Sequence, residues 1–266
     1  MKKTLIALAV AASAAVSGSA MAWTQNGIGG SVDFSGTLNP KDLVTPWEVK
    51  TGAAVTGLNA DITKGQSVIN IAVDQAIPVL GIRTQTAAAF PGQANGNGLS
   101  PQIDFNGAVD VGSFINGVTT LTLNVTDADG VKTGTMSAPF LAAAGISRVG
   151  KDTDAFSAYV YSDYAVSSFT GGLGASSEQV LPSLSEVISR LNAIDSEFSA
   201  NFNQQGAPDT GAWRSNSFDI AASTYSGFYG SGIERGKAIK ITLDQAASGD
   251  APIQWKASLP VTVSYQ

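Results

Sequence analysis

The chain has 266 residues, with 15 Lys or Arg and 21 Asp or Glu, so its formal net charge is −6, and it contains neither histidine nor cysteine. The acidic balance argues against nucleic acid as a partner. The missing residue types exclude disulfides, His-dependent nucleophilic catalysis and His-containing zinc sites. Carboxylate-only catalysis remains open, but we expect a non-enzymatic protein without a cofactor or a metal.

Residues 1–22 have the features of a secretory signal peptide. Lys2 and Lys3 precede an apolar run from Leu5 to Val16, and Ala20-Met21-Ala22 is a small-x-small cleavage site. The apolar run is too short to span a bilayer. We therefore expect export, with a mature chain that begins at Trp23.

A strongly alternating segment follows at the start of the mature chain. Every second residue is apolar or glycine, and the residues between are small or polar; the alternating set is Ile28, Gly30, Val32, Phe34, Gly36 and Leu38. This period of two predicts a strand with one hydrophobic face. The strand can pair within its own sheet, which is the default for a terminal strand, or it can complete the sheet of another molecule.

The next segments predict β structure separated by loops. Strands are expected at residues 47–50 and 67–73, and loops at 52–65 and 87–101. Residues 118–126 and 131–138 predict a hairpin joined by Asp127-Ala128-Asp129-Gly130. The Asp-x-Asp-Gly run also begins a calcium loop, but the later oxygen ligands and the terminal Glu are missing, so a hairpin turn is favoured.

One segment switches to the period of a helix. Apolar residues recur every three or four positions at Leu184, Val187, Ile188, Leu191, Ile194, Phe198 and Phe202. The pair Ser183 and Glu186 forms a capping box at the start of this segment. The spacing predicts an amphipathic helix over 183–202 that serves as a packing element.

Alternation returns in the last part of the chain. A strand is expected at 238–243, and Leu259, Val261, Val263 and Tyr265 alternate nearly to the last residue. Strands at both ends, with a helical and loop-rich stretch between them, predict a mainly β protein: a β-sandwich that carries one large insertion.

These features together resemble the subunits of bacterial chaperone–usher fimbriae, specifically the FaeG-type major adhesive subunits and the related capsule-like antigens of the ClpG type. The resemblance covers nearly the whole chain. The residues that carry it are the leader 1–22, Trp23, Gly30-Ser31-Val32-Asp33 with Gly36, Trp47-Glu48-Val49-Lys50, Asp127-Ala128-Asp129-Gly130 with Lys132 and Gly134, Ser183-Leu184-Ser185, and Gln254-Trp255 before the last strand.

The resemblance implies an incomplete immunoglobulin-like β-sandwich, residues 39–266, that lacks its last strand and is completed by donor-strand exchange. Residues 23–38 would be the N-terminal donor strand. A periplasmic chaperone would engage the groove strand Leu259, Val261, Val263 and Tyr265, and an outer-membrane usher would then link the subunit to other copies of itself in a surface fimbria. Ile253 departs from the pattern, since many such subunits have glycine at that position.

The resemblance also implies that an α/β insertion, residues 148–235, is a receptor-binding subdomain for a host glycoprotein or glycolipid. Sugar recognition needs aromatic rings and planar polar groups. The insertion offers Arg148, Lys151, Asp152, Tyr159, Tyr161, Asp163 and Tyr164, and a second patch of Trp213, Arg214, Tyr225 and Tyr229. For each residue a plain packing or solvated role competes with this one.

Two other functions remain open at this point. An outer-membrane β-barrel also uses alternating strands, although the helix and the long loops argue against it. A secreted carbohydrate-active protein, such as a glycosidase that uses a carboxylate pair, would need two acids facing one cleft, and no spacing selects such a pair.

Overall fold

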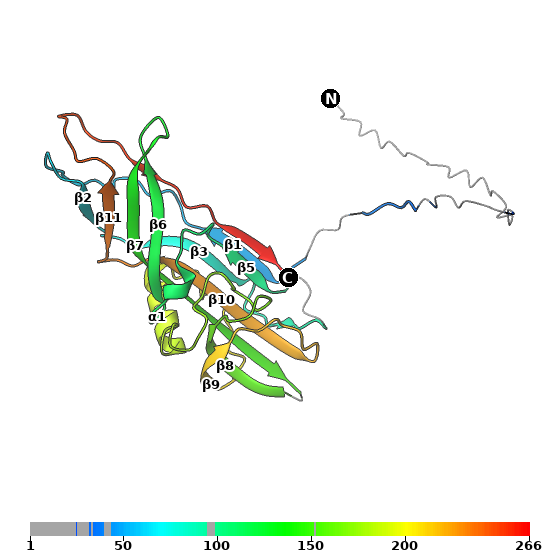
Figure 1. The fold of residues 1–266 in the computed structure, drawn as a ribbon. Helices are drawn as coiled ribbons and strands as arrows, with labels where there is room; N and C mark the ends of the chain where they lie inside the picture. Colours follow the sequence, from blue (N-terminus) through cyan, green and yellow to red (C-terminus); the bar gives the residue numbers. More distant parts are fainter. Residues whose placement is uncertain (1–24, 26–31, 33, 40–43, 95–98, 152) are drawn as a thin grey trace, which may run out of the picture. The chain divides into compact units, whose positions relative to one another are not determined.

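The computed structural model describes residues 25, 32, 34–39, 44–94, 99–151 and 153–266 (Figure 1). The chain divides into a first unit, Met1–Asp42, and a compact body, Leu43–Gln266. The signal peptide, Ile28, Gly30 and Asp152 lie outside the described residues. Within the body, we find no helix long and apolar enough to cross a membrane among the described residues.

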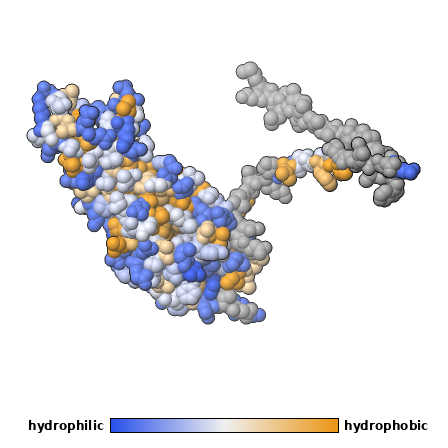
Figure 2. All heavy atoms as spheres, in the orientation of Figure 1, coloured by the Kyte–Doolittle hydropathy of each residue, from blue (hydrophilic) through white to orange (hydrophobic). Residues whose placement is uncertain are grey.

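The described part of the first unit has no assigned strand or helix and carries exposed hydrophobic side chains. Phe34 is 93% exposed and Leu38 is 96% exposed. Figure 2 shows orange, hydrophobic surface on the described part of this unit. A large apolar side chain that is almost completely in water has no burial partner in its own unit.

The body is mainly β, with one α-helix among the described residues, so the mainly β part of the fold prediction is confirmed. The elements in chain order are β1 (Trp47–Thr51), β2 (Val68–Ala72), β3 (Ile77–Thr84), β4 (Phe90–Pro91), β5 (Pro101–Asp104), the 3₁₀ turn η1 (Val111–Ser113), β6 (Val118–Thr126), β7 (Lys132–Gly150), β8 (Thr153–Tyr161), α1 (Leu184–Ile194), β9 (Asp209–Arg214), β10 (Ser223–Ile233), β11 (Ala238–Leu243), β12 (Lys256–Ala257) and β13 (Thr262–Tyr265).

The 19-residue strand β7 organises the sheet. The main path of the sheet runs β1-β3-β10-β7-β11-β2, while β6 and β8 also pair with β7. The first half of β7 pairs with β6 and β11, and its second half pairs with β10 and β8. All these pairs are antiparallel; β8 and β9 form a parallel pair, and β13 pairs with β5 in a separate two-stranded sheet.

The predicted hairpin is confirmed as β6 and β7. Residues alternate between buried and exposed along β6, as its sequence predicts. In the turn, Asp127 Oδ1 accepts hydrogen bonds from the backbone amides of Asp129 and Val131, and Gly130 has a φ of 81°. The Asp127 carboxylate therefore shapes the turn, and the glycine supplies the left-handed conformation that the turn requires.

One of the two hydrogen bonds of the predicted capping box is confirmed, because Ser183 Oγ accepts a hydrogen bond from the Glu186 amide at 3.1 Å. The predicted extent of the helix is wrong: α1 ends at Ile194 rather than at residue 202. Asp195 stops it by accepting the Glu197 amide with its own side chain, which competes with a further helical turn. The chain then continues as turns to residue 201.

Glycines in two neighbouring strands let the segment after α1, residues 195–201, lie close to the sheet. Gly81 of β3 and Gly230 of β10 are register partners, and a Cβ atom at either would overlap the Phe198 ring. Phe198 is therefore buried although it lies outside the helix, in one cluster with Leu191 and Ile194. The helical spacing therefore predicts correctly that these apolar residues face the sheet. It does not predict that the helix ends at Ile194.

Candidate functional site

A long groove runs along the body and has a volume of about 1350 Å³. Its two walls are residues 51–62 and residues 249–259 with Val261, which lie far apart in the sequence. Its floor is apolar and comes from several strands of the sheet: Ile77, Val79, Leu121, Leu123, Met136, Ile233 and Ile239. A groove of this size, with a hydrocarbon floor, can take an extended peptide whose alternate side chains are apolar.

The backbone of both walls has few hydrogen-bond partners. Within the described part of the chain, residues 53–62 form one backbone–backbone hydrogen bond, from the Asn59 amide to the Gly57 carbonyl. Residues 248–255 form none. An added strand can satisfy backbone amides and carbonyls that have no partner in the protein on both sides of an apolar floor.

The walls are joined at one end of the groove. Gly65 donates its amide to the Ala247 carbonyl, Ala247 donates to the Gln66 carbonyl, and Lys64 forms an ion pair with Asp250. The Gly52 amide of the first wall donates to the Val79 carbonyl, and within the second wall β12 pairs with β6. These contacts join the two walls at one end and attach each wall to a strand of the sheet.

Two of the four C-terminal candidate residues, Leu259 and Val261, line the groove. Val263 and Tyr265 lie on β13, where they pair with β5 and pack, half-buried, against the core. Ile253 also lines the groove. The loop that the sequence predicts at 52–65 is confirmed, since no strand or helix is assigned in this described stretch. That this loop forms a wall of the groove has no signal in the sequence beyond the spacing of Val55, Leu58 and Ile62.

The candidate receptor-binding residues are divided between the two faces of β8. Arg148 of β7 is the register partner of Phe156, and its guanidinium carbon lies 4.8 Å from the centre of the Phe156 ring. Trp213 stacks on the same ring, with centroids 4.7 Å apart. Tyr159 and Tyr161 have the opposite parity in the strand, so they lie on the other face. Arg148 and these tyrosines therefore do not form one surface.

The remaining candidates lie at the ends of β8 and β9. Asp163 forms an ion pair with Arg214 at 2.8 Å, Tyr164 is exposed, and Lys151 is exposed. Tyr159 is partly buried against the cluster around α1. Trp213 is 38% exposed, which leaves part of its ring free for contact.

The second patch that the sequence indicated is wrong in two of its four members. Tyr225 and Tyr229 of β10 are completely buried in the core. Tyr225 stacks on Phe90, and Tyr229 stacks on Phe169. Aromatic residues in a Gly- and Ser-rich stretch suit a buried, closely packed strand as well as they suit an exposed sugar-binding patch. Tyr225 and Tyr229 belong to a buried strand.

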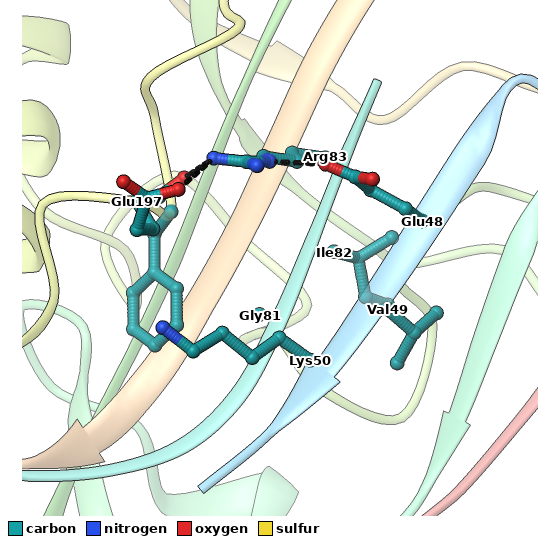
Figure 3. Close-up of a pocket in the computed structure, with 8 residues that line it drawn as sticks. Glu48, Val49, Lys50, Gly81, Ile82, Arg83 and Glu197 are labelled. Carbon is teal, nitrogen blue, oxygen red and sulfur yellow. Dashed lines mark hydrogen bonds and ion pairs between the residues drawn. The ribbon is translucent and has the colours of Figure 1, made fainter. Parts of the chain in front are cut away.

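A smaller pocket, about 190 Å³, lies beside β1 and β3. Arg83 lies between two carboxylates there, with its Nε 2.5 Å from Glu48 and its Nη1 2.7 Å from Glu197 (Figure 3). Nearby, Lys50 pairs with Asp195 at 2.5 Å. These ion pairs attach the segment after α1 to the strand β1, which leads into the first wall of the groove.

This attachment should weaken in acid. Burial alone would raise the pKa of Asp195, but hydrogen bonds from Lys50 and the Glu197 amide and the charges of Lys50 and Arg83 outweigh it, so its pKa is lowered. A lowered folded-state pKa stabilises the fold above the unfolded value of about 4, and this contribution is lost as the pH falls through the folded-state pKa. We expect Lys50→Met to reduce the free energy of unfolding by about 0.2–1 kcal/mol at pH 7 and by less at pH 2.

Guanidinium titrations at pH 7 and pH 2 check this expectation. Lys240→Met on β11 is the matched control, because Lys240 has no ion pair among the described residues. The assignment fails if Lys50→Met and the control lose the same stability at both pH values.

The chain is similar to proteins of known families over its whole length. The family model described as "Fimbrial, major and minor subunit" matches residues 1–266. K88 fimbrial protein AC of Escherichia coli is 32% identical over 286 residues, covering 100% of both chains. F41 fimbrial protein of Escherichia coli is 28% identical with the same full coverage, and the K88 minor fimbrial subunit FaeI is 26% identical over 92% of this chain and 93% of its own.

Proposed function

The chain belongs to the family of major and minor fimbrial subunits of the K88 and F41 type, and from this premise we propose that its copies assemble by inserting residues 28–38 of one subunit into the groove of the next. As a member of this family it is a non-enzymatic structural protein of surface fimbriae. This membership favours the fimbrial subunit over the other functions that the sequence left open.

The observation that carries the proposal is the match between the groove and the alternating segment. The groove offers an apolar floor between two walls that form few backbone–backbone hydrogen bonds. In residues 28–38 the apolar residues Ile28, Val32, Phe34 and Leu38 are separated by two or four positions, so they share one face of a strand. The described members of this set are exposed in their own unit. Each side chain contributes about 1.5–3 kcal/mol on burial, so insertion gains on the order of 10 kcal/mol before the cost of ordering the segment.

The two glycines of the alternating segment fit the same role. Gly30 and Gly36 stand at positions where the other members of the set carry apolar side chains. A glycine in an inserted strand suits a point where the groove floor comes too close for a side chain. The inserted strand would act as the missing last strand of an immunoglobulin-like sandwich formed by residues 39–266.

Export then requires that the groove be covered before polymerisation. We infer that a periplasmic chaperone covers it by contacting Leu259 and Val261 in the groove and Val263 and Tyr265 on the adjoining β13, and that an outer-membrane usher exchanges the chaperone for the next subunit. The half-buried alternation of these four residues supports this role, since a strand added beside them would complete their burial.

Phe34→Asp tests the insertion with a matched control. It places a charge on the face that would enter the apolar groove, where an unpaired carboxylate is strongly disfavoured. We expect at least a tenfold loss of fibres in sheared-cell preparations viewed by electron microscopy. Ser35→Asp adds the same charge to the opposite face and should leave fibre yield near the wild-type level. Equal yields from the two variants would contradict the proposed face of insertion.

A second candidate function is binding of a host glycoprotein or glycolipid by residues 148–235. The supporting observation is that Trp213 is fixed on Phe156 while part of its ring stays exposed, and that Tyr164 is exposed next to the Asp163–Arg214 pair. Rigid exposed rings beside planar charged groups suit the apolar and hydroxyl faces of a sugar. Arg148, Lys151, Asp152, Tyr159 and Tyr161 remain candidates on the same subdomain.

Trp213→Ala and Tyr164→Ala separate adhesion from assembly. Fibres of each variant should form in normal amounts but should lose at least tenfold in binding on a glycan array. Tyr225→Phe, whose ring is completely buried in the core, is the control and should bind as the wild type does. Unchanged binding by both alanine variants would remove these two rings from the proposal.

A further inference from the structure

One methionine lies on the floor of the groove. The sequence has three methionines, and Met1 and Met21 belong to the predicted signal peptide, so Met136 is the only one after residue 22. It lies on β7 as the register partner of Leu123 on β6 and of Ile241 on β11. Its side chain is 7% exposed and lines the groove together with Leu121 and Ile239.

The chemistry of methionine makes this position sensitive to oxidants. Hydrogen peroxide transfers one oxygen atom to the thioether sulfur; the O–O bond breaks, a sulfur–oxygen bond forms and water leaves, so the sulfur is oxidised and the peroxide is reduced. The product is a polar sulfoxide, which accepts hydrogen bonds. The side chains beside it on the floor are Leu, Ile and Val, and none of them can donate a hydrogen bond.

We propose that Met136 is an oxidation site that controls whether the groove accepts a strand, an inference that rests on the proposed function. The reduced thioether is a flexible apolar part of the floor and adapts to the side chains inserted above it. The sulfoxide leaves an acceptor without a partner once the inserted strand excludes water. Oxidation of a free subunit therefore lowers the affinity of its groove for an inserted strand by a factor of at least about ten.

The coupling works in both directions. If the sulfoxide weakens strand insertion, an inserted strand must disfavour formation of the sulfoxide by the same free energy. The inserted strand also removes the groove floor from solvent. Met136 in an assembled fibre therefore reacts with peroxide more slowly than Met136 in a free subunit, so assembled fibres resist an oxidant that stops the assembly of new subunits.

Peroxide treatment of the full mature chain tests this inference, with Met136→Leu as the matched control. Subunits are released from fibres with guanidinium, refolded by dilution at low concentration and treated with hydrogen peroxide. Mass spectrometry measures the 16 Da addition, and circular dichroism checks that the treated subunits are folded. A fluorescent synthetic peptide of residues 23–38 then reports groove filling by anisotropy. Leucine keeps the size and the apolar character of the floor but cannot be oxidised.

The expected result is that untreated wild type and both samples of Met136→Leu bind the peptide, while oxidised and folded wild type binds at least tenfold more weakly. Oxidised wild type that binds as tightly as untreated protein overturns this inference and leaves the proposed function standing. An equal loss in peroxide-treated Met136→Leu also overturns it, because the damage then lies elsewhere. If untreated wild type binds no peptide, the proposed function itself fails.

Discussion

A subunit that keeps the signal peptide but lacks residues 23–38 should form no fibres. The deletion removes every residue of the alternating segment and leaves the compact body Leu43–Gln266 with its groove. Each subunit can then receive a strand but cannot give one, so chains of more than one copy cannot grow. We expect this variant to remain in the periplasm as a soluble complex with the chaperone, and electron microscopy of whole cells should show none of the wild-type fibres.

Adding the missing strand as a separate peptide makes the experiment specific. A synthetic peptide of residues 23–38 should raise the melting temperature of the deleted subunit, because a ligand that binds the folded state alone stabilises it by mass action. The same peptide carrying Phe34→Asp should have little effect. Fibres assembled by the deletion variant would refute the role of residues 23–38 as the donor strand.

The largest loss of stability from a single substitution should come from Trp47→Ala in β1. Trp47 is 3% exposed, and its ring lies 5.3 Å from Phe90, 5.5 Å from Phe218 and 5.8 Å from Phe169. Its Nε1 also donates a buried hydrogen bond to the Leu99 carbonyl at 2.6 Å. Truncation leaves a cavity and an unpaired carbonyl, so we expect the free energy of unfolding to fall by about 3–5 kcal/mol.

Guanidinium denaturation followed by far-ultraviolet circular dichroism measures this loss. Trp213→Ala is the matched control, because it removes the same side chain from a half-exposed site and should cost less than half as much. Trp47→Phe keeps most of the packing and loses the hydrogen bond, so its cost should lie between the two. If Trp47→Ala and Trp213→Ala are equally destabilising, the aromatic cluster is not the centre of stability that its burial indicates.

The elements that sequence reasoning located are those with one buried and one exposed face. The strands β2, β6 and β11 have this property, so their alternation is visible in the sequence. In contrast, β10 is buried on both faces over nearly its whole length, and its Ser, Gly and aromatic residues follow no period. The strand β3 is mostly buried or half-buried on both faces, which again removes the alternation.

Part of the groove could be predicted from local sequence patterns, and part of it could not. Leu259 and Val261 could be identified because they continue a local alternating pattern. The floor could not be identified, because it combines Leu121 and Met136 with Ile239, and no local period links residues so far apart in the chain. The wall at 51–62 has no regular period, and its residues 53–62 form a single backbone–backbone hydrogen bond within the described chain. What makes it a wall is the empty space beside it, which is a property of the tertiary structure alone.

The continuity of β7 has a consequence for how the assembled protein presents its surface. Nineteen residues of extended chain span roughly 60 Å, and β7 has paired neighbours along this length, beside the groove at its start and beside β8 and β10 at its end. A single backbone thus runs through both regions and is paired with neighbouring strands in each. If a strand inserts into the groove as proposed, tension on that strand would pass along β7 to the part of the subunit that holds Trp213 and Tyr164.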